Sequence, residues 1–325
     1  VIGGLLSGRL STGLHIGTVR PQVFGNTKNF YLLFKAVVVL TLETSVAMSL
    51  VAFVFGAFLW GAKVTDLLAI LSVIVATMTL ALVVVSPLTM LVSFTSFKHG
   101  LDPDIILYPV ESTVSDVLIT LCYVSVLSLF FLPNALGLLI IIVLCLILAI
   151  SASYFLYRNF KEREFVKTLK ESFLTMILVA FIVNVTGSVL GKISEAIGAR
   201  REIYTVYPAL IDTIGDVGAV IGSTATTKLA LGTLKPSVSA IGNHLNEIIG
   251  AWTASIIMFV IYSTLSLIIQ GMFILNVFIR FTTLLLTANV LAASFIIAIS
   301  WAVSIITFHR GLDPDNFVIP IESSM

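Results

Sequence analysis

Seven long, uninterrupted apolar stretches constrain this chain more than any other feature of its sequence. Each exceeds the roughly 20 residues that an α-helix needs to cross about 30 Å of hydrocarbon. A membrane β-barrel would instead alternate apolar and polar residues over about ten residues. The chain is therefore predicted to be an all-α integral membrane protein in contact with a lipid bilayer. The stretches cover approximately residues 31–61, 66–97, 105–132, 134–157, 172–195, 243–271 and 274–308.

Composition supports the membrane assignment and excludes one class of partner. Hydrophobic residues make up 58% of the chain and charged residues only 11%, whereas about a quarter of the residues in a soluble domain are charged. The 18 basic and 17 acidic residues nearly cancel, so bulk charge indicates no nucleic-acid partner. Two more polar, glycine-rich stretches, 1–17 and 209–233, are predicted to be helices that pack against protein, and a last span opens at about residue 316.

The distribution of basic residues predicts the orientation. Lysine and arginine gather in alternate connections between the spans, and the positive-inside rule places such connections in the cytoplasm. The mixed-charge segment 158–171 joins the two halves of the chain on that side. We therefore expect a multi-pass protein of the cell membrane, with this segment as a solvated, cytoplasmic extension of a helix.

An internal repeat divides the sequence. Residues 100–113 and 311–324 match at eight of fourteen positions, with a constant offset of 211. A repeat of this length is a whole domain rather than a solenoid unit. Shorter pairings set 17–21 against 232–236, 1–3 against 220–222, and Glu43 with Ala47 against Glu247 with Ala251.

Helix parity predicts how the repeats are arranged. A five-helix unit starts and ends on opposite sides of the membrane, so the unmatched span at 134–157 returns the chain and makes the two units parallel. The expected fold is two parallel five-helix repeats joined by an extra transmembrane helix, with a pseudo-twofold axis along the membrane normal. The domains would be 1–132, lacking its first helix, the connecting helix 133–158, and 159–325, with its last helix truncated. Such a chain is a pseudo-dimer that requires no further oligomer.

Asp116 is the sharpest candidate for a functional residue. An ionisable side chain at the centre of a membrane helix costs about 2.5 to 3.5 kcal/mol on insertion scales, so its presence suggests a function. At helical spacing, one face carries polar side chains that would line a hydrated space. A carboxyl group hydrogen-bonded inside the bundle is the structural alternative. The polar face comprises Ser112, Thr113, Asp116, Thr120 and Tyr123.

A second polar face lies in the stretch 209–233. Asp212 and Asp216 stand one helical turn apart, and Ser223 and Thr227 continue the same face. The glycines among them would allow close helix packing or a local opening that exposes carbonyl oxygens to a cavity. Both interpretations of the glycines remain open at this point; they are Gly215, Gly218 and Gly222.

Four glutamates complete the candidate set. Glu43 and Glu247 are expected near helix ends, where a carboxylate is favoured by the helix dipole even without a ligand. Glu111 and Glu322 each follow a proline that is expected to start a helix, so capping and cation attraction are both reasonable roles. The nearby pairs Asp102 with Asp104 and Asp313 with Asp315 flank prolines, which is typical of turns and caps.

Together these side chains predict the kind of ligand. Carboxylates, hydroxyls and carbonyls are hard oxygen donors that suit Mg²⁺, Ca²⁺ or Mn²⁺ rather than Zn²⁺ or Cu²⁺. Few carboxylates spread along a wide pathway suit Mg²⁺ best, because it dehydrates reluctantly. The transported ion is therefore expected to be Mg²⁺, with Mn²⁺ or Ca²⁺ as alternatives.

At these residues the sequence resembles the MgtE-type magnesium transporter and channel family, and in its duplication the family 41 solute carriers. The family's last-helix pattern matches Asp102-Pro103, Pro109, Thr113 and Asp116. The resemblance implies that Asp116 binds Mg²⁺ in the pore. The second repeat matches at Asp313-Pro314, Pro320 and Ser324, and its equivalent Asp would fall beyond Met325.

A second family signature, Pro-x6-Gly-Asn-x-Gly, resembles Pro208, Gly215, Asp216 and Gly218, with Asp in place of Asn. We therefore expect divalent cation transport through a pore at the interface of the two repeats, and no enzymatic activity. Two alternatives remain: a proton- or sodium-coupled exchanger, and an intramembrane aspartyl protease. The second arises because Gly215-Asp216 resembles the Gly-x-Gly-Asp motif of that class, although position 213 is Thr.

Overall fold

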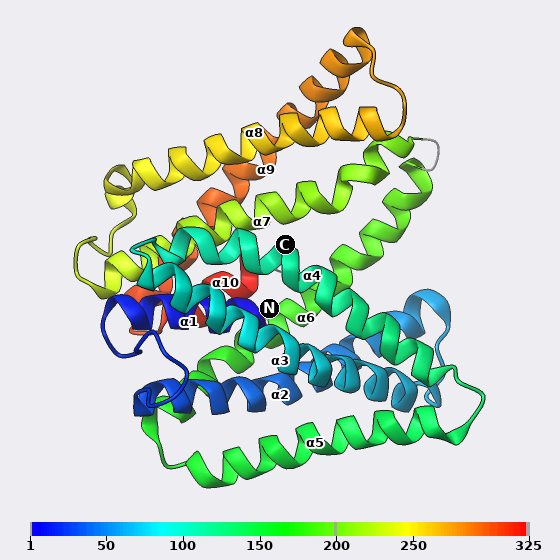
Figure 1. The fold of residues 1–325 in the computed structure, drawn as a ribbon, viewed down its shortest axis with the longest axis vertical. Helices are drawn as coiled ribbons and strands as arrows, with labels where there is room; N and C mark the ends of the chain where they lie inside the picture. The colour runs from blue at the N-terminus through cyan, green and yellow to red at the C-terminus, as the bar shows by residue number, and fades with distance from the viewer. Residues whose placement is uncertain (1, 198–199, 323–325) are drawn as a thin grey trace. The chain divides into compact units, whose positions relative to one another are not determined.

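The computed structural model describes the backbone of residues 2–197 and 200–322 and the side chains of residues 3–192 and 200–322. Within these ranges the chain forms helices joined by turns, without a β-strand (Figure 1). Seven helices are long and apolar enough to cross a membrane, which confirms the predicted all-α membrane class. The helices are α1 (Ile2–His15), α2 (Lys28–Trp60), α3 (Asp66–Lys98), α4 (Pro103–Phe130), α5 (Ala135–Asn159), α6 (Arg163–Ile197), α7 (Arg201–Ala230), η1 (Val238–His244), α8 (Leu245–Ile269), α9 (Leu275–His309), η2 (Pro314–Asn316) and α10 (Val318–Glu322).

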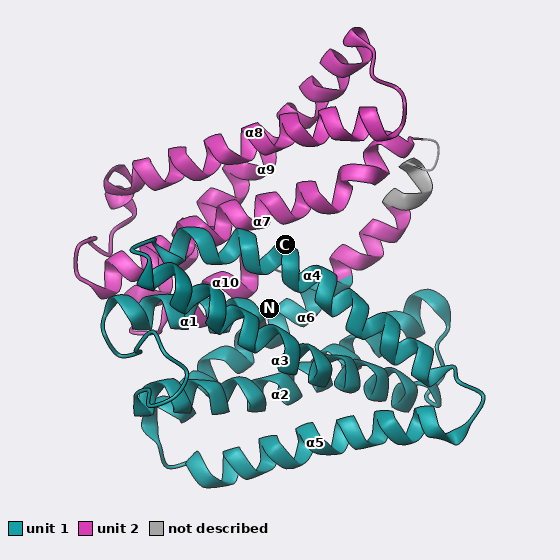
Figure 2. Ribbon diagram, viewed as in Figure 1, with its two compact units in different colours: residues 1–184, 324 teal, residues 185–323, 325 magenta. Residues whose placement is uncertain are grey.

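Packing divides the chain into two compact units, with the boundary inside α6 (Figure 2). Unit 1 contains the described residues up to 184, and unit 2 contains those from 185 to 322. Helix α5, predicted as a connector between repeats, packs against α2, α3 and α4 within unit 1. Each unit is described below by itself.

Local sequence explains where the long helices begin and end. Thr27 caps α2, and its side chain accepts a hydrogen bond from the backbone N–H of Phe30. Gly61 ends that helix in the left-handed conformation, with φ of 68°, a conformation in which glycine meets no Cβ clash. Asp102 caps α4, and Pro103 occupies the first turn, where its missing N–H costs nothing.

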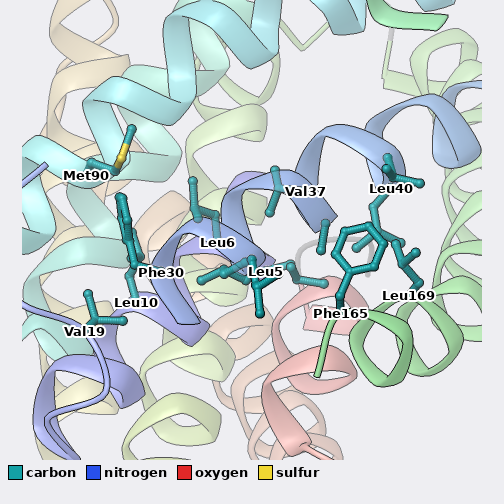
Figure 3. Close-up of a cluster of buried hydrophobic side chains, with 14 of the residues drawn as sticks. Leu5, Leu6, Leu10, Val19, Phe30, Val37, Leu40, Met90, Phe165 and Leu169 are labelled. Atoms are coloured by element: carbon teal, nitrogen blue, oxygen red, sulfur yellow. The ribbon is translucent and has the colours of Figure 1, made fainter. Parts of the chain in front are cut away.

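The largest apolar core lies in unit 1, where α1, α2, α3 and the first half of α6 meet (Figure 3). Leu5 and Leu10 of α1 are fully buried, as are Leu40 of α2 and Phe165 of α6. Segment 158–171 is thus only partly solvated, because one face of the start of α6 is buried. The spacing of these residues explains this outcome, since Phe165, Leu169 and Met176 recur on a single face of the helix.

Small hydroxylated residues fill the contacts between helices in unit 1. Thr41, Ser45 and Ser49 of α2 are buried, and each donates to the backbone carbonyl four residues earlier, at 2.7, 2.5 and 2.6 Å. Such side chains satisfy their own hydroxyl groups and let neighbouring helix backbones approach closely. This pattern is expected where lipid, rather than water, surrounds the bundle.

Helix α5 shows the apolar exterior expected of a lipid-facing helix. Gly137, Ile141, Leu148 and Ala152 are buried on one face. Most of the other face is exposed and apolar, including Leu139, which is 56% exposed. A surface of this kind is stable only where the surrounding solvent is hydrocarbon.

Gly137→Ala is expected to destabilise unit 1. A Cβ at this position would overlap the backbone carbonyl of Leu129, and a backbone atom cannot rotate aside as a side chain can. The expected loss is about 1 to 3 kcal/mol, the range for overpacked sites, visible as a lower unfolding temperature of the purified protein. Gly187→Ala is the control, because a Cβ there meets nothing within 4 Å. Equal unfolding temperatures for the two variants would contradict the prediction.

Unit 2 has its own core between α7, α8 and α9. Val217 and Ile221 of α7 pack with Ile248 of α8 and Ala293 of α9. A buried polar contact lies beside them: Asn289 accepts from Trp252 Nε1 at 3.1 Å and donates to Ser255 Oγ at 2.5 Å. This contact links α8 to α9 at membrane depth.

Matching hydrogen bonds establish the register of the repeat. The turn after α1 has Val19 N–H donating to Gly13 O, and the turn after α7 has Leu234 N–H donating to Lys228 O, at 3.0 and 3.2 Å. The hydroxyls of Thr18 and Thr233 donate to the same two carbonyls. The offset of 215 pairs Gly3 with Gly218. The sequence pairing of residues 1–3 with 220–222 is therefore wrong by one helical turn.

The prediction that Glu43 opens a helix is also wrong. Helix α2 begins at Lys28, so Glu43 lies near its middle. The glycines that follow α2 and α8, Gly61 and Gly271, have φ of 68° and 65° and differ by 210, so an offset of 204 does not hold across this helix. The reason is the Thr27 cap, which starts α2 well before its continuous apolar run.

Candidate cation site

Glu111 is the best-defined candidate residue in unit 1. It lies on α4, is 5% exposed, and accepts hydrogen bonds from Ser7 Oγ of α1 at 2.5 Å and Thr89 Oγ1 of α3 at 3.2 Å. Gly3 packs directly on its carboxylate, since a Cβ there would overlap Glu111 Oε1. Three helices therefore converge on one buried carboxylate.

Glu322 holds the equivalent place in unit 2, at the offset of 211. It lies on α10 and is 1% exposed. Gly218 of α7 packs on its carboxylate, as Gly3 does on Glu111. Ser300 of α9 corresponds to Thr89, but its hydroxyl donates to Ile296 O at 2.9 Å. Gly222 takes the place of Ser7, so neither of the two described counterparts supplies the donor that Glu111 has.

Neither glutamate caps a helix. Pro109 lies inside α4, which begins at Pro103, and Pro320 lies inside α10. The expectation that these prolines start helices is wrong because Asp102 and Asp313 already form the caps. The side chain of each accepts a hydrogen bond from the N–H two residues on, at 2.9 and 3.2 Å. The cap role predicted for these aspartates is confirmed.

Asp116 lies at the middle of α4, 13 residues after Pro103 and 14 before Phe130. Its side chain is exposed, as are those of Thr113 and Thr120, while Ser112 is half-buried. It is close enough to Glu111 for their charges to interact. A carboxylate at this depth cannot face acyl chains cheaply. The polar face predicted for α4 therefore exists on the helix surface and requires water or protein beside it.

Asp212 and Asp216 are half-buried on α7, one turn apart as predicted, and Ser223 and Thr227 are buried further along the helix. Helix α7 runs without a break from Arg201 to Ala230. No glycine of α7 therefore opens the backbone in this structure.

The glycines of α7 act as packing sites. A Cβ at Gly218 would overlap the Glu322 carboxylate, and one at Gly222 would overlap the side chain of Val318. Of the two interpretations of these glycines, the structure favours close packing.

Glu43 and Glu247 have different surroundings. Glu43 Oε2 is buried in mid-helix, and none of the described side chains or backbone groups hydrogen-bonds to it. Glu247 lies in the first turn of α8, as predicted, and pairs with Lys228 Nζ at 2.5 Å. His244, fully buried, lies 3.6 Å from the same carboxylate. A neutralised Glu247 is a weaker cation ligand than the sequence suggested.

The structure also joins residues that sequence reasoning did not combine. His15, Asp102 and Asp104 bring one ligand atom each within 4.8 Å of one another. His15 and Asp102 are far apart in the chain, so no spacing rule connects them. Ser324, a predicted match in the second repeat, lies outside the described residues.

Comparison with known proteins identifies the family. The comparisons with curated proteins and with solved structures gave no significant match. A family profile described as MgtE, divalent cation transporter, matches residues 1–126 and 207–325, which is more than half of the chain. The matched segments include α4 with Asp116 and α7 with Asp216. The chain therefore belongs to the MgtE family of divalent cation transporters.

Proposed function

We propose that this protein conducts Mg²⁺ across the membrane, along a carboxylate-lined pathway between its two repeats. One observation carries the proposal: the exposed Asp116 carboxylate stands halfway along a helix long and apolar enough to span a membrane. A carboxylate at this depth is costly unless hydrated, paired or bound to a cation. The duplicated sequence favours a pathway between the repeats.

The donor set supports Mg²⁺ as the ion. The polar face of α4 offers a carboxylate with the hydroxyls of Ser112, Thr113 and Thr120. Oxygen donors that are few and separated suit an ion that keeps several of its waters. Two charges moving down an inside-negative potential gain about 4.6 kcal/mol per 100 mV, taking ~2.3 kcal/mol for each charge. Uptake thus needs no other energy source.

The other candidate residues take supporting roles in this proposal. Asp212 and Asp216 would attract the ion along α7. The buried Glu111 would hold α1, α3 and α4 together, because its hydrogen bonds join all three helices. Glu322 and Glu43 would add negative potential without direct coordination, and the paired Glu247 would contribute least. The segment joining α5 to α6 is proposed to face the cytoplasm.

Flux in proteoliposomes under controlled gradients tests the proposal. We expect Mg²⁺ flux to follow the membrane potential and to persist when proton and sodium gradients are collapsed. Flux that stops on collapse of either gradient would favour the coupled exchanger, since Asp212, Asp216 and Glu43 could each carry a proton or Na⁺. Isothermal titration with Mg²⁺, Mn²⁺ and Ca²⁺ would then rank the ions by affinity.

A further inference from the structure

We propose that His15, Asp102 and Asp104 form a second divalent-cation site, suited to a transition metal and separate from the Asp116 face. His15 ends α1, while Asp102 and Asp104 begin α4. The three ligand atoms lie within 4.8 Å of one another. The bound ion would fasten the end of α1 to the start of α4, the same two helices that Glu111 and Ser7 join further along.

The histidine is oriented for ligation. Its Nδ1 lies 2.9 Å from the carbonyl oxygen of Ser11. A carbonyl can only accept, so Nδ1 must carry the proton, and in the neutral ring Nε2 then presents a lone pair. Histidine ligands of metals commonly hold their other ring nitrogen in such a hydrogen bond, which sets the tautomer and the ring direction. An edge-on contact with Phe97 further restricts the ring.

The lone pair of Nε2 faces a carboxylate. Nε2 lies 3.6 Å from Asp102 Oδ1, and two acceptors at this separation require a positive charge between or beside them. Two ligands at about 2.1 Å from one metal ion at a tetrahedral angle would be about 3.4 Å apart. The observed separation therefore suits two ligands of one ion. Asp104, 1% exposed, closes the inner side, while His15 and Asp102 leave an approach from solvent.

A similar histidine in unit 2 shows the contrast. His244 also lies 3.6 Å from a carboxylate, that of Glu247. There, however, Lys228 Nζ supplies the positive charge, 2.5 Å from Glu247 Oε1. For Asp102, the ion-pair partner among the described residues is His15 itself.

The donor set distinguishes this site from a magnesium pathway. An imidazole nitrogen with two carboxylates suits Zn²⁺, Co²⁺ or Mn²⁺, whereas Mg²⁺ prefers oxygen ligands alone. The second repeat supplies an internal comparison. Asp313 and Asp315 are kept there, but the offset of 215 puts Ala230 in the place of His15. The proposed site is therefore specific to unit 1.

Titration with Co²⁺ in a large excess of Mg²⁺ tests the proposal, because Mg²⁺ occupies oxygen-only sites and leaves an imidazole site available. We expect one equivalent of Co²⁺ to bind the purified full chain, with visible absorption bands and a raised unfolding temperature. His15→Ala should weaken binding by at least about tenfold and remove the thermal shift. Asp102→Asn should weaken binding as well.

The matched control is His99→Ala. His99 makes the same kind of contact, Nδ1 to Thr95 O at 2.8 Å, and is exposed, but it is not part of the cluster. Its loss should leave Co²⁺ binding unchanged. Ala230→His should add a second equivalent, because it completes the same donor set in unit 2. That gain does not depend on the stability of a His15 variant.

Two results would overturn the proposal. One is the absence of stoichiometric Co²⁺ binding to the wild-type chain, which would leave His15 and Asp102 as an ion pair only. The other is binding that His15→Ala and Asp102→Asn do not change. Neither result bears on Mg²⁺ flux, which is measured separately and depends on Asp116.

Discussion

Replacing Asp116 with asparagine is expected to lower Mg²⁺ flux into proteoliposomes by at least about tenfold, with the fold intact. Asparagine keeps the size of the side chain but removes its charge, so only the attraction for a cation is lost. A tenfold change corresponds to about 1.4 kcal/mol, a modest demand on a carboxylate within a membrane span. Because Asp116 is exposed, its replacement should disturb little packing.

Two further variants make the Asp116 test specific. Asp116→Glu keeps the charge and should retain part of the flux. Glu162→Gln removes a charge of the same sign outside the spans, from an exposed pair in which Lys28 Nζ lies 2.8 Å from Glu162 Oε2, and should leave flux near the wild-type level. Wild-type flux in a folded Asp116→Asn protein would sink the assignment of this residue to the pathway.

Gly222→Ala is expected to cause the largest loss of stability among the glycine variants of α7. Its Cβ would overlap the Val318 side chain on α10, which is itself fully buried. Overpacking costs about 1 to 3 kcal/mol, against a gain of about 0.5 to 1 kcal/mol from replacing a helical glycine. The unfolding temperature of the purified variant should therefore fall, and flux through the same preparation should be measured alongside.

Gly215→Ala is the control on the same helix. The nearest described atom to a Cβ at that position is Glu322 O at 3.9 Å, an ordinary contact, so this variant should be as stable as the wild type or more so. The double variant Gly222→Ala with Val318→Ala should recover stability, because it removes the overlapping side chain. Close packing would be the wrong explanation for Gly222 if the three variants unfolded together.

Sequence reasoning located the helices well. Each predicted span coincides with a helix, most within about three residues at both ends, as for 66–97 against Asp66–Lys98. The error at the start of α6 arose from charge, because Arg163 and Lys170 masked a helix whose buried face includes Phe165 and Leu169. Hydropathy averages over all faces of a helix, so it missed an amphipathic first half.

The site was predicted in part. The charge of Asp116 at mid-helix and the Asp102 cap follow from sequence, since each depends on its own helix. The bonds of Glu111 to Ser7 and Thr89 could not be predicted, because they join residues 104 and 22 positions apart. The same separation hid the pairing of His15 with Asp102.

The sequence by itself determined the fold class, the helix limits and the family, because a chain in lipid must satisfy its backbone hydrogen bonds within each apolar segment. The tertiary structure alone decided that Gly3 and Gly218 rest on buried glutamates and that Pro109 lies inside a helix. Those outcomes depend on how far each helix is rotated and shifted against its neighbours. Rotation and register are set by packing between distant segments, which no local pattern contains.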